Sequence, residues 1–164
     1  MKLEELLDND LFVFDLDRTI WECYNKYNRS IWAKQLLYPY KKLNDDLIED
    51  DVLSQCILQP NIRDILKYLK ENRKDVAFLS CGASLRNEFQ PSIEMLKLFN
   101  IYYEFNAFRT LEYKTFSKYE FLQKLTNRKI VIFDDDVEVT ESCKQLKDAI
   151  AINRYSFKGW KELL

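Results

Sequence analysis

Residues 11–19 read Leu-Phe-Val-Phe-Asp-Leu-Asp-Arg-Thr. The four apolar residues at the start are typical of a short strand buried on both faces. The side-chain period of two in an extended chain sends the carboxylates of Asp15 and Asp17 to the same side. Two carboxylates at the exit of a buried strand repel each other and lose hydration, and a divalent cation relieves that cost. The segment therefore predicts a magnesium site, with a solvated strand-to-loop turn as the alternative.

The composition is that of a globular protein. The chain has 164 residues, of which 47% are hydrophobic and 15% aromatic, and its formal net charge is −2. These values exclude wholesale disorder and a bulk attraction to nucleic acid or to an acidic membrane. No leader and no apolar run long enough for a membrane helix is evident, so a cytoplasmic protein without a membrane partner is expected.

Histidine is absent and the cysteines are scattered. Without histidine, the carboxylates are the natural acid, base and nucleophile. The cysteines lack the spacing of metal ligands and are expected to be reduced thiols of an intracellular protein; they are Cys23, Cys56, Cys81 and Cys143.

Apolar strands alternate with amphipathic helices along the rest of the chain. Strands are expected at 76–79, within 101–108, and at 130–133 and 149–152. Helices are expected after Asn61, Pro91 and Ser117 and over 137–147, and 157–164 is expected to dock as a tail. Continuously apolar strands indicate a parallel sheet with helices on both faces, which is the α/β class.

Two segments between the first two strands show no clean period. The aromatic-rich region after Thr19 is interpreted as loop, hairpin or short helix, and most of its rings as a local hydrophobic cover. The acidic patch at 44–51 is interpreted as a solvated face or a helix start.

Polar side chains follow three of the predicted strands. Asp15, Asp17 and Thr19 follow the first strand, Ser80 follows the second, and Asp134 and Asp135 follow the fourth. Parallel strands bring their carboxyl ends to one edge of a sheet, where ligands of such folds bind. The capping-box pattern from Ser117 to Glu120 puts Lys118 in the first turn of a helix that can reach the same edge.

This set of polar residues suits phosphoryl transfer. Asp15 is predicted to attack phosphorus and form an aspartyl-phosphate, and Asp17 to act as acid and then base, with its pKa raised by crowding from neighbouring carboxylates. Mg²⁺ is assigned to the acidic residues Asp15, Asp17 (through its backbone carbonyl), Asp134 and Asp135. Phosphate is assigned to Ser80, Cys81, Lys118 and the backbone N–H groups that begin at Leu16, while Thr19 braces the loop.

The same residues resemble the haloacid dehalogenase (HAD) superfamily. Asp15-Leu16-Asp17-Arg18-Thr19 is similar to its first motif, Ser80 to the second, Lys118 to the third and Ile132-Phe133-Asp134-Asp135 to the acidic fourth. Within the superfamily, Phe14 to Trp21 resembles the magnesium-dependent phosphatase group.

The resemblance implies a fold and an activity. The fold is a single Rossmann-like three-layer α/β/α domain over 1–164, with a five-stranded parallel sheet in the order 5-4-1-2-3. It is of the capless type, and residues 20–58 are an aromatic-rich insert of flap and loop near the site. The activity is Mg²⁺-dependent hydrolysis of phosphate monoesters, small or borne by a phosphoprotein.

Two departures and several alternatives remain open at this stage. Arg18 stands where the phosphatase group has Tyr, and Cys81-Gly82 replaces an Arg-Thr pair. Lys114 is a rival to Lys118 for the third motif. The alternative functions are a nucleic-acid end phosphatase, for which the sequence offers little, a receiver-like module and a non-catalytic phosphate-binding module.

Overall fold

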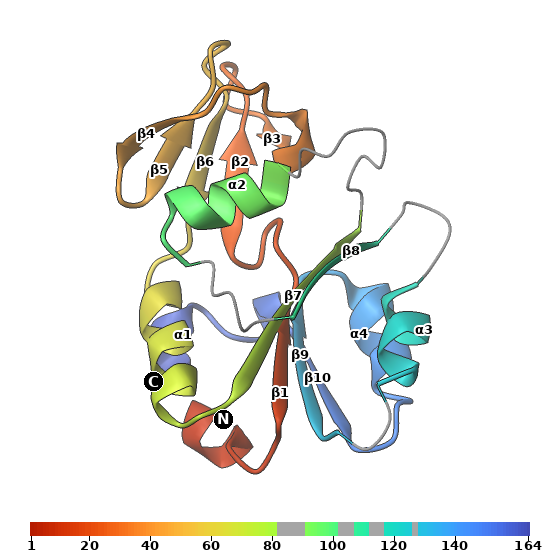
Figure 1. Cartoon of the computed structure of the whole chain (residues 1–164). Helices are drawn as coiled ribbons and strands as arrows, with labels where there is room; N and C mark the ends of the chain where they lie inside the picture. The colour runs from red at the N-terminus through yellow and green to blue at the C-terminus, as the bar shows by residue number, and fades with distance from the viewer. Residues whose placement is uncertain (82–90, 102–106, 112–116, 126–127) are drawn as a thin grey trace.

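A computed structural model of the chain describes residues 1–81, 91–101, 107–111, 117–125 and 128–164. The chain forms two β-sheets, one parallel and one antiparallel, with helices around them (Figure 1). The α/β class predicted from the sequence is confirmed by this arrangement.

The parallel sheet has five strands in the order β10-β9-β1-β7-β8. The strands are β1 (Leu11–Phe14), β7 (Asp75–Cys81), β8 (Ala107–Leu111), β9 (Ile130–Asp134) and β10 (Ala149–Asn153). All four pairings are parallel, and Phe14 of β1 stands in register with Phe78 of β7 and Phe133 of β9. The residues that follow Phe14 and Phe133 are therefore neighbours at one edge of the sheet.

Both faces of this sheet are covered at its central strands, which explains the continuous apolar runs of residues 11–14 in β1 and 130–133 in β9. On one face, Phe12, Phe14 and Phe133 pack with α1 (Ile62–Glu71), η1 (Leu3–Leu6) and η4 (Trp160–Leu163) in the larger hydrophobic core. On the other face, Val13 and Ile132 pack with α3 (Lys118–Gln123) and α4 (Val137–Cys143). Figure 1 shows α1 and the C-terminus on one side of the sheet and α3 and α4 on the other.

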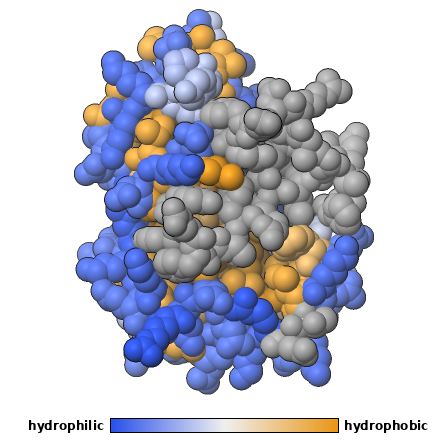
Figure 2. Space-filling view, in the orientation of Figure 1, coloured by the Kyte–Doolittle hydropathy of each residue, from blue (hydrophilic) through white to orange (hydrophobic). Residues whose placement is uncertain are grey.

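The helices begin close to where the sequence predicts them, and the tail packs as expected. In the tail, Trp160 and Leu163 are buried, and the indole N–H of Trp160 donates to the carbonyl of Thr19 at 3.1 Å. The third strand lies at the end of its predicted range and beyond it, since β8 begins at Ala107 and residues 102–106 lie outside the described part. Figure 2 shows hydrophobic side chains on the face near α3, where apolar residues line a hollow between α3 and the sheet.

The aromatic-rich insert forms the second sheet. Its strands, in the antiparallel order β3-β2-β6-β5-β4, are β2 (Trp21–Tyr24), β3 (Ser30–Ile31), β4 (Lys41–Asn44), β5 (Leu47–Glu49) and β6 (Gln55–Leu58). It stands beyond the carboxyl ends of the parallel strands, with α2 (Pro91–Leu98) lying across it (Figure 1). Short 3₁₀ turns complete the chain at η2 (Ala33–Gln35) and η3 (Arg154–Ser156).

The interpretation of residues 44–51 as a helix start is wrong, because the patch forms a β-hairpin. The N–H of Asp46 donates to the Asn44 side chain at the hairpin turn, and residues 47–49 form β5. Asp50 is buried and its carboxylate accepts three backbone N–H bonds, from Leu37, Val52 and Ser54. An aspartate that satisfies several N–H groups in this way stabilises a turn rather than a helix end.

The expectation of reduced thiols is wrong for two of the cysteines. Cys23 and Cys56 form a disulfide, with Cα atoms 4.1 Å apart. They lie directly opposite each other on the antiparallel strands β2 and β6. The register of that pairing brings them together across a sequence separation of 33 residues, so their spacing in the sequence gives no sign of it. Cys143 is free and buried, as expected of a structural thiol.

Candidate active site

The candidate site lies at the carboxyl ends of β1 and β9. Asp15 follows β1 directly, and its backbone N–H donates to the carbonyl of Phe133 at 2.9 Å. Asp134 is the last residue of β9 and is only 1% exposed, while Asp15 is 8% exposed. The parallel register thus places two buried carboxylates from neighbouring strands side by side, as the sequence predicts.

Lys118 lies between these two carboxylates. Its Nζ is 2.5 Å from Oδ1 of Asp15 and 2.6 Å from Oδ2 of Asp134. Lys118 is the first residue of α3, whose N-cap Ser117 accepts the N–H of Glu120 at 3.1 Å, so the capping prediction is confirmed. The helix start therefore aims a buried ammonium at the sheet edge. Lys114, the rival candidate, lies outside the described residues.

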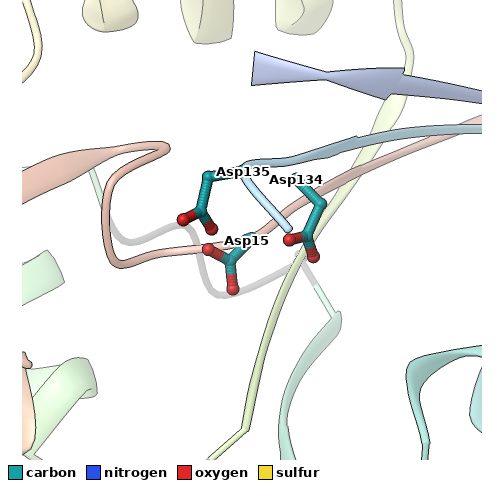
Figure 3. Close-up of side chains that lie close together, drawn as sticks. All are labelled: Asp15, Asp134 and Asp135. Carbon is teal, nitrogen blue, oxygen red and sulfur yellow. The ribbon is translucent and has the colours of Figure 1, made fainter. Parts of the chain in front are cut away.

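A third carboxylate, from Asp135, joins the pair. Figure 3 shows the carboxylates of Asp15, Asp134 and Asp135 converging from the two strand ends. One oxygen from each lies within 4.8 Å of the others. Asp136 is not part of the cluster, because its side chain caps α4 by accepting the N–H groups of Glu138 and Val139.

These residues fit an oxygen-seeking divalent cation. The only donor atoms in the cluster are carboxylate oxygens, which suit Mg²⁺ and Mn²⁺ better than softer metals. Among the described residues, the charges of Lys118 and Arg18 act on the three clustered carboxylates and do not fully balance them, so the cluster keeps negative charge that a cation neutralises.

Burial raises the pKa values of all three carboxyl groups, and the charges of neighbouring carboxylates add to its effect. Burial is the main cause that raises the pKa of Asp15 from 3.8 to about 6, against the lowering effect of Lys118. Burial, followed by the charge of Asp15, likewise raises the pKa of Asp134 to about 6. The pKa of Asp135 is also raised, by burial and then by the charge of Asp134. The two carboxylates hold the pKa of Lys118 above its usual value, so this side chain stays charged.

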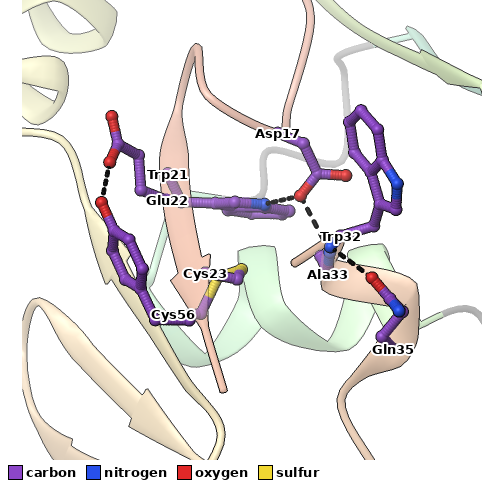
Figure 4. The surroundings of a disulfide bond; sticks show 9 residues. Asp17, Trp21, Glu22, Cys23, Trp32, Ala33, Gln35 and Cys56 are labelled. Atoms are coloured by element: carbon purple, nitrogen blue, oxygen red, sulfur yellow. Dashed lines mark hydrogen bonds between the residues drawn. A yellow bond between two sulfur atoms is a disulfide. The ribbon is translucent and has the colours of Figure 1, made fainter. Parts of the chain in front are cut away.

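Asp17 lies apart from the carboxylate cluster. Its Oδ1 accepts the indole N–H of Trp21 at 3.0 Å and the backbone N–H of Ala33 at 2.9 Å (Figure 4). Both donors come from the insert, on β2 and η2. The structure therefore does not bring the Asp17 carboxylate into the predicted metal set with Asp15, Asp134 and Asp135.

The pKa of Asp17 is raised, as predicted, but for a different reason. Burial is the largest cause, and the bonds from Ala33 and Trp21 oppose it. Crowding by other carboxylates is not the cause. Since both hydrogen bonds end on Oδ1, the other oxygen, Oδ2, is the one suited to carry a proton.

The loop between Asp15 and Trp21 is tightly wound. The carbonyl of Leu16 accepts the N–H groups of Thr19, Ile20 and Trp21 at 3.1, 2.8 and 3.3 Å. The hydroxyl of Thr19 donates to Oδ2 of Asp15 at 3.4 Å, which matches its predicted bracing contact. The side chain of Leu16 is fully buried, so only its backbone N–H is a candidate for binding phosphate.

Ser80 and Cys81 end β7, beside β1 in the sheet. Since Phe78 is in register with Phe14, Ser80 lies close to the level of Asp15 at the same edge. Ser80 is buried. The side chain of Cys81 lies outside the described part of the structure.

Sequence reasoning missed the part that the insert plays at the site. The rings after Thr19, Trp21 among them, are interpreted from the sequence mostly as a local hydrophobic cover, and nothing there singles out Ala33. The indole N–H of Trp21 is one of three side-chain donors within four residues of Asp17, with those of Arg18 and Thr19, so the sequence offers it as a candidate partner without singling it out. The backbone donor at Ala33 depends on tertiary folding and leaves no signal in the sequence.

The comparisons with known proteins agree with this geometry. A family model described as Acid Phosphatase matches residues 9–152. The chain belongs to the acid phosphatase family. Membership assigns the hydrolysis of phosphomonoesters and a phosphorylated substrate to the protein. The matched range contains every carboxylate described above and Lys118. No curated protein matches the chain.

The family assignment is accompanied by one finding on membranes. None of the helices in the described ranges combines the length and the apolar character needed to cross a bilayer.

Lys118→Met tests the charge balance of the site. We expect the free energy of unfolding at about pH 7 to fall by about 3 kcal/mol, because buried carboxylates lose their cation. The loss should be smaller at about pH 5. The pKa values of Asp15 and Asp134 are about 6 in the folded protein, against an ordinary value of 3.8. As the pH falls, the folded state therefore binds protons at these groups before the unfolded state does, and it gains stability.

Urea unfolding of the metal-free protein at both pH values measures this effect. The control is Lys147→Met, which removes a charge of the same sign from an exposed position and should change the stability by less than about 0.5 kcal/mol. Equal losses for Lys118→Met at the two pH values would contradict the charge balance described here.

Proposed function

We propose that the protein is a Mg²⁺-dependent phosphomonoesterase of the HAD type that works through an aspartyl-phosphate on Asp15. The observation that supports this most is the contact of Lys118 with both Asp15 and Asp134 at the carboxyl edge of the parallel sheet. A buried, charge-compensated carboxylate at that edge has the surroundings of a nucleophile.

Asp15, Asp134 and Asp135 would hold the Mg²⁺, together with the backbone carbonyl of Asp17. When bound, the ion supplies positive charge that reduces repulsion between the carboxylates and an incoming phosphate. Lys118 supplies fixed charge at the same place and keeps the Asp15 carboxylate ionised and oriented.

In the first step, a carboxylate oxygen of Asp15 attacks phosphorus and the bond from phosphorus to the ester oxygen breaks. Asp17 donates its proton to that departing oxygen, so the alcohol leaves neutral. In the second step, Asp17 accepts a proton from water, the water oxygen attacks phosphorus and the bond to Asp15 breaks. Inorganic phosphate leaves and Asp17 is protonated again.

The different surroundings of Asp15 and Asp17 support the proposed roles of nucleophile and acid. Asp15 contacts Lys118, whose charge favours the ionised form against the effect of burial, whereas the half-buried Asp17 accepts two hydrogen bonds from the insert on Oδ1 and has no contact with Lys118 among the described hydrogen bonds. Two carboxyl groups with different surroundings can take opposite roles at one pH. Ser80 and the backbone N–H groups of Leu16 and Cys81 would bind the phosphate oxygens.

Hydrolysis of p-nitrophenyl phosphate tests the proposal. Wild-type protein treated with a chelator should regain activity on addition of Mg²⁺. Asp15→Asn should lower kcat by at least about 1,000-fold, because the nucleophile is lost. The control is Asp136→Asn, which keeps the cap of α4 and should retain activity. Activity that persists in Asp15→Asn, or that is indifferent to Mg²⁺ after chelation, would contradict the proposal.

Trp21→Phe tests the placement of Asp17. The change removes the indole donor and keeps an aromatic ring against Phe99. The indole bond holds the pKa of Asp17 down, so its loss should raise that pKa further. The alkaline limb of the pH profile of kcat should therefore move to higher pH, and kcat should fall by about tenfold. The control is Trp160→Phe, which removes a bond to Thr19 instead and should leave that limb in place. An unshifted limb in Trp21→Phe would contradict the assigned role of Asp17.

A further inference from the structure

Arg18 is a charged residue at the site to which the mechanism gives no role. It follows Asp17 directly, in the left-handed backbone region with φ of 64°. Its N–H donates to the carbonyl of Trp21 at 2.7 Å, which closes the turn between β1 and β2. The turn therefore carries the Arg18 side chain on the same short segment as the proposed general acid.

A ring of the insert holds this side chain in place. The guanidinium carbon lies 4.4 Å from the centre of the Trp32 ring. Within the described residues, the guanidinium makes one hydrogen bond, from Nη2 to Oγ of Ser30 at 3.5 Å. The Trp32 ring covers the flat face of the guanidinium. The N–H groups of the guanidinium lie in its plane and point away from its edges, so stacking leaves them able to bind another group.

The Arg18–Trp32 pair lies beside Asp17, the proposed general acid. The residue after Trp32 is Ala33, whose N–H binds Asp17, so one short segment of the insert contacts both Asp17 and Arg18. Figure 4 shows the Trp32 ring standing beside the Asp17 carboxylate. A group that protonates the departing oxygen must lie next to the alcohol that departs. The substituents of that alcohol therefore come close to Arg18.

The positive charge of Arg18 affects which alcohol portions of a substrate are favoured at this position. The positive charge of Arg18 acts on both Asp17 and Asp135. The carboxylates of the site repel a substrate whose alcohol portion is itself negative. A half-buried arginine with outward N–H groups offsets that repulsion and offers a planar fork for a carboxylate or a phosphate.

We propose that Arg18, held on Trp32, selects phosphomonoesters whose alcohol portion carries a second anionic group, a carboxylate or another phosphate. This inference rests on the proposed function, since it takes Asp17 as the acid that faces the leaving group. Arg18 binds the substituent and takes no part in breaking the phosphate ester.

Two substrate pairs test the selection and distinguish the two anions. 3-Phosphoglycerate and glycerol 3-phosphate differ by a carboxylate, whereas fructose 1,6-bisphosphate and fructose 6-phosphate differ by a phosphate. Wild-type kcat/KM should favour the more anionic member of at least one pair by about tenfold. The pair that shows the preference identifies the anion.

Arg18→Met should remove that preference by raising KM for the more anionic member, with a much smaller change for the member whose alcohol portion is uncharged. Arg18→Lys keeps the charge and loses the planar fork, so it should retain part of the preference. The matched control is Arg29→Met, which removes the same charge from an exposed position of the insert and should leave the preference unchanged. Melting temperatures of all variants check that the fold is retained.

The outcomes separate this inference from the proposed function. Wild-type activity on p-nitrophenyl phosphate without a preference in either pair would overturn the selection by Arg18 and leave the phosphatase proposal standing. A preference that survives in Arg18→Met, or that is lost equally in Arg29→Met, would also overturn it. A wild-type protein that hydrolyses none of these substrates, p-nitrophenyl phosphate included, would contradict both the selection by Arg18 and the phosphatase proposal.

Discussion

The ion-pair contacts of Lys118 with Asp15 and Asp134 join three parts of the chain that are far apart in sequence. Asp15 follows β1, Asp134 ends β9, and Lys118 begins α3. Each charge is buried, and a buried charge is tolerated only when a partner compensates it. The position of α3 against the sheet, the parallel register of β1 with β9 and the chemistry of the site therefore depend on the same contact.

The insert makes the second contribution, by giving two neighbouring aspartates different surroundings. Asp15 faces Lys118, whereas Asp17 turns to the indole of Trp21 and the N–H of Ala33. A segment that would otherwise be described as a cover over the site thus orients one of its acidic groups. The same segment holds Arg18 on Trp32, so the insert connects acid catalysis with the choice of leaving group that we propose.

Much of the sheet and of the carboxylate cluster could be predicted from the sequence, because both depend on local patterns. Apolar runs before Asp15 and Asp134 mark strands, and the serine cap before Lys118 marks a helix start. The antiparallel sheet was anticipated only as a hairpin among other interpretations, since its strands are short and their exposure is mixed. The Cys23–Cys56 pair and the turn at Asp50 depend on strand register and on backbone donors distant in sequence, which no local pattern reveals.

The most direct test of the central claim is the position of a bound metal. Mn²⁺ binds carboxylate oxygens as Mg²⁺ does and scatters X-rays anomalously, so crystals grown with Mn²⁺ show where the cation lies. An anomalous peak among the oxygens of Asp15, Asp134 and Asp135, with Lys118 still in contact with Asp15, is the predicted result. A fully occupied Mn²⁺ elsewhere, with these carboxylates bound by Lys118 alone, would contradict the account.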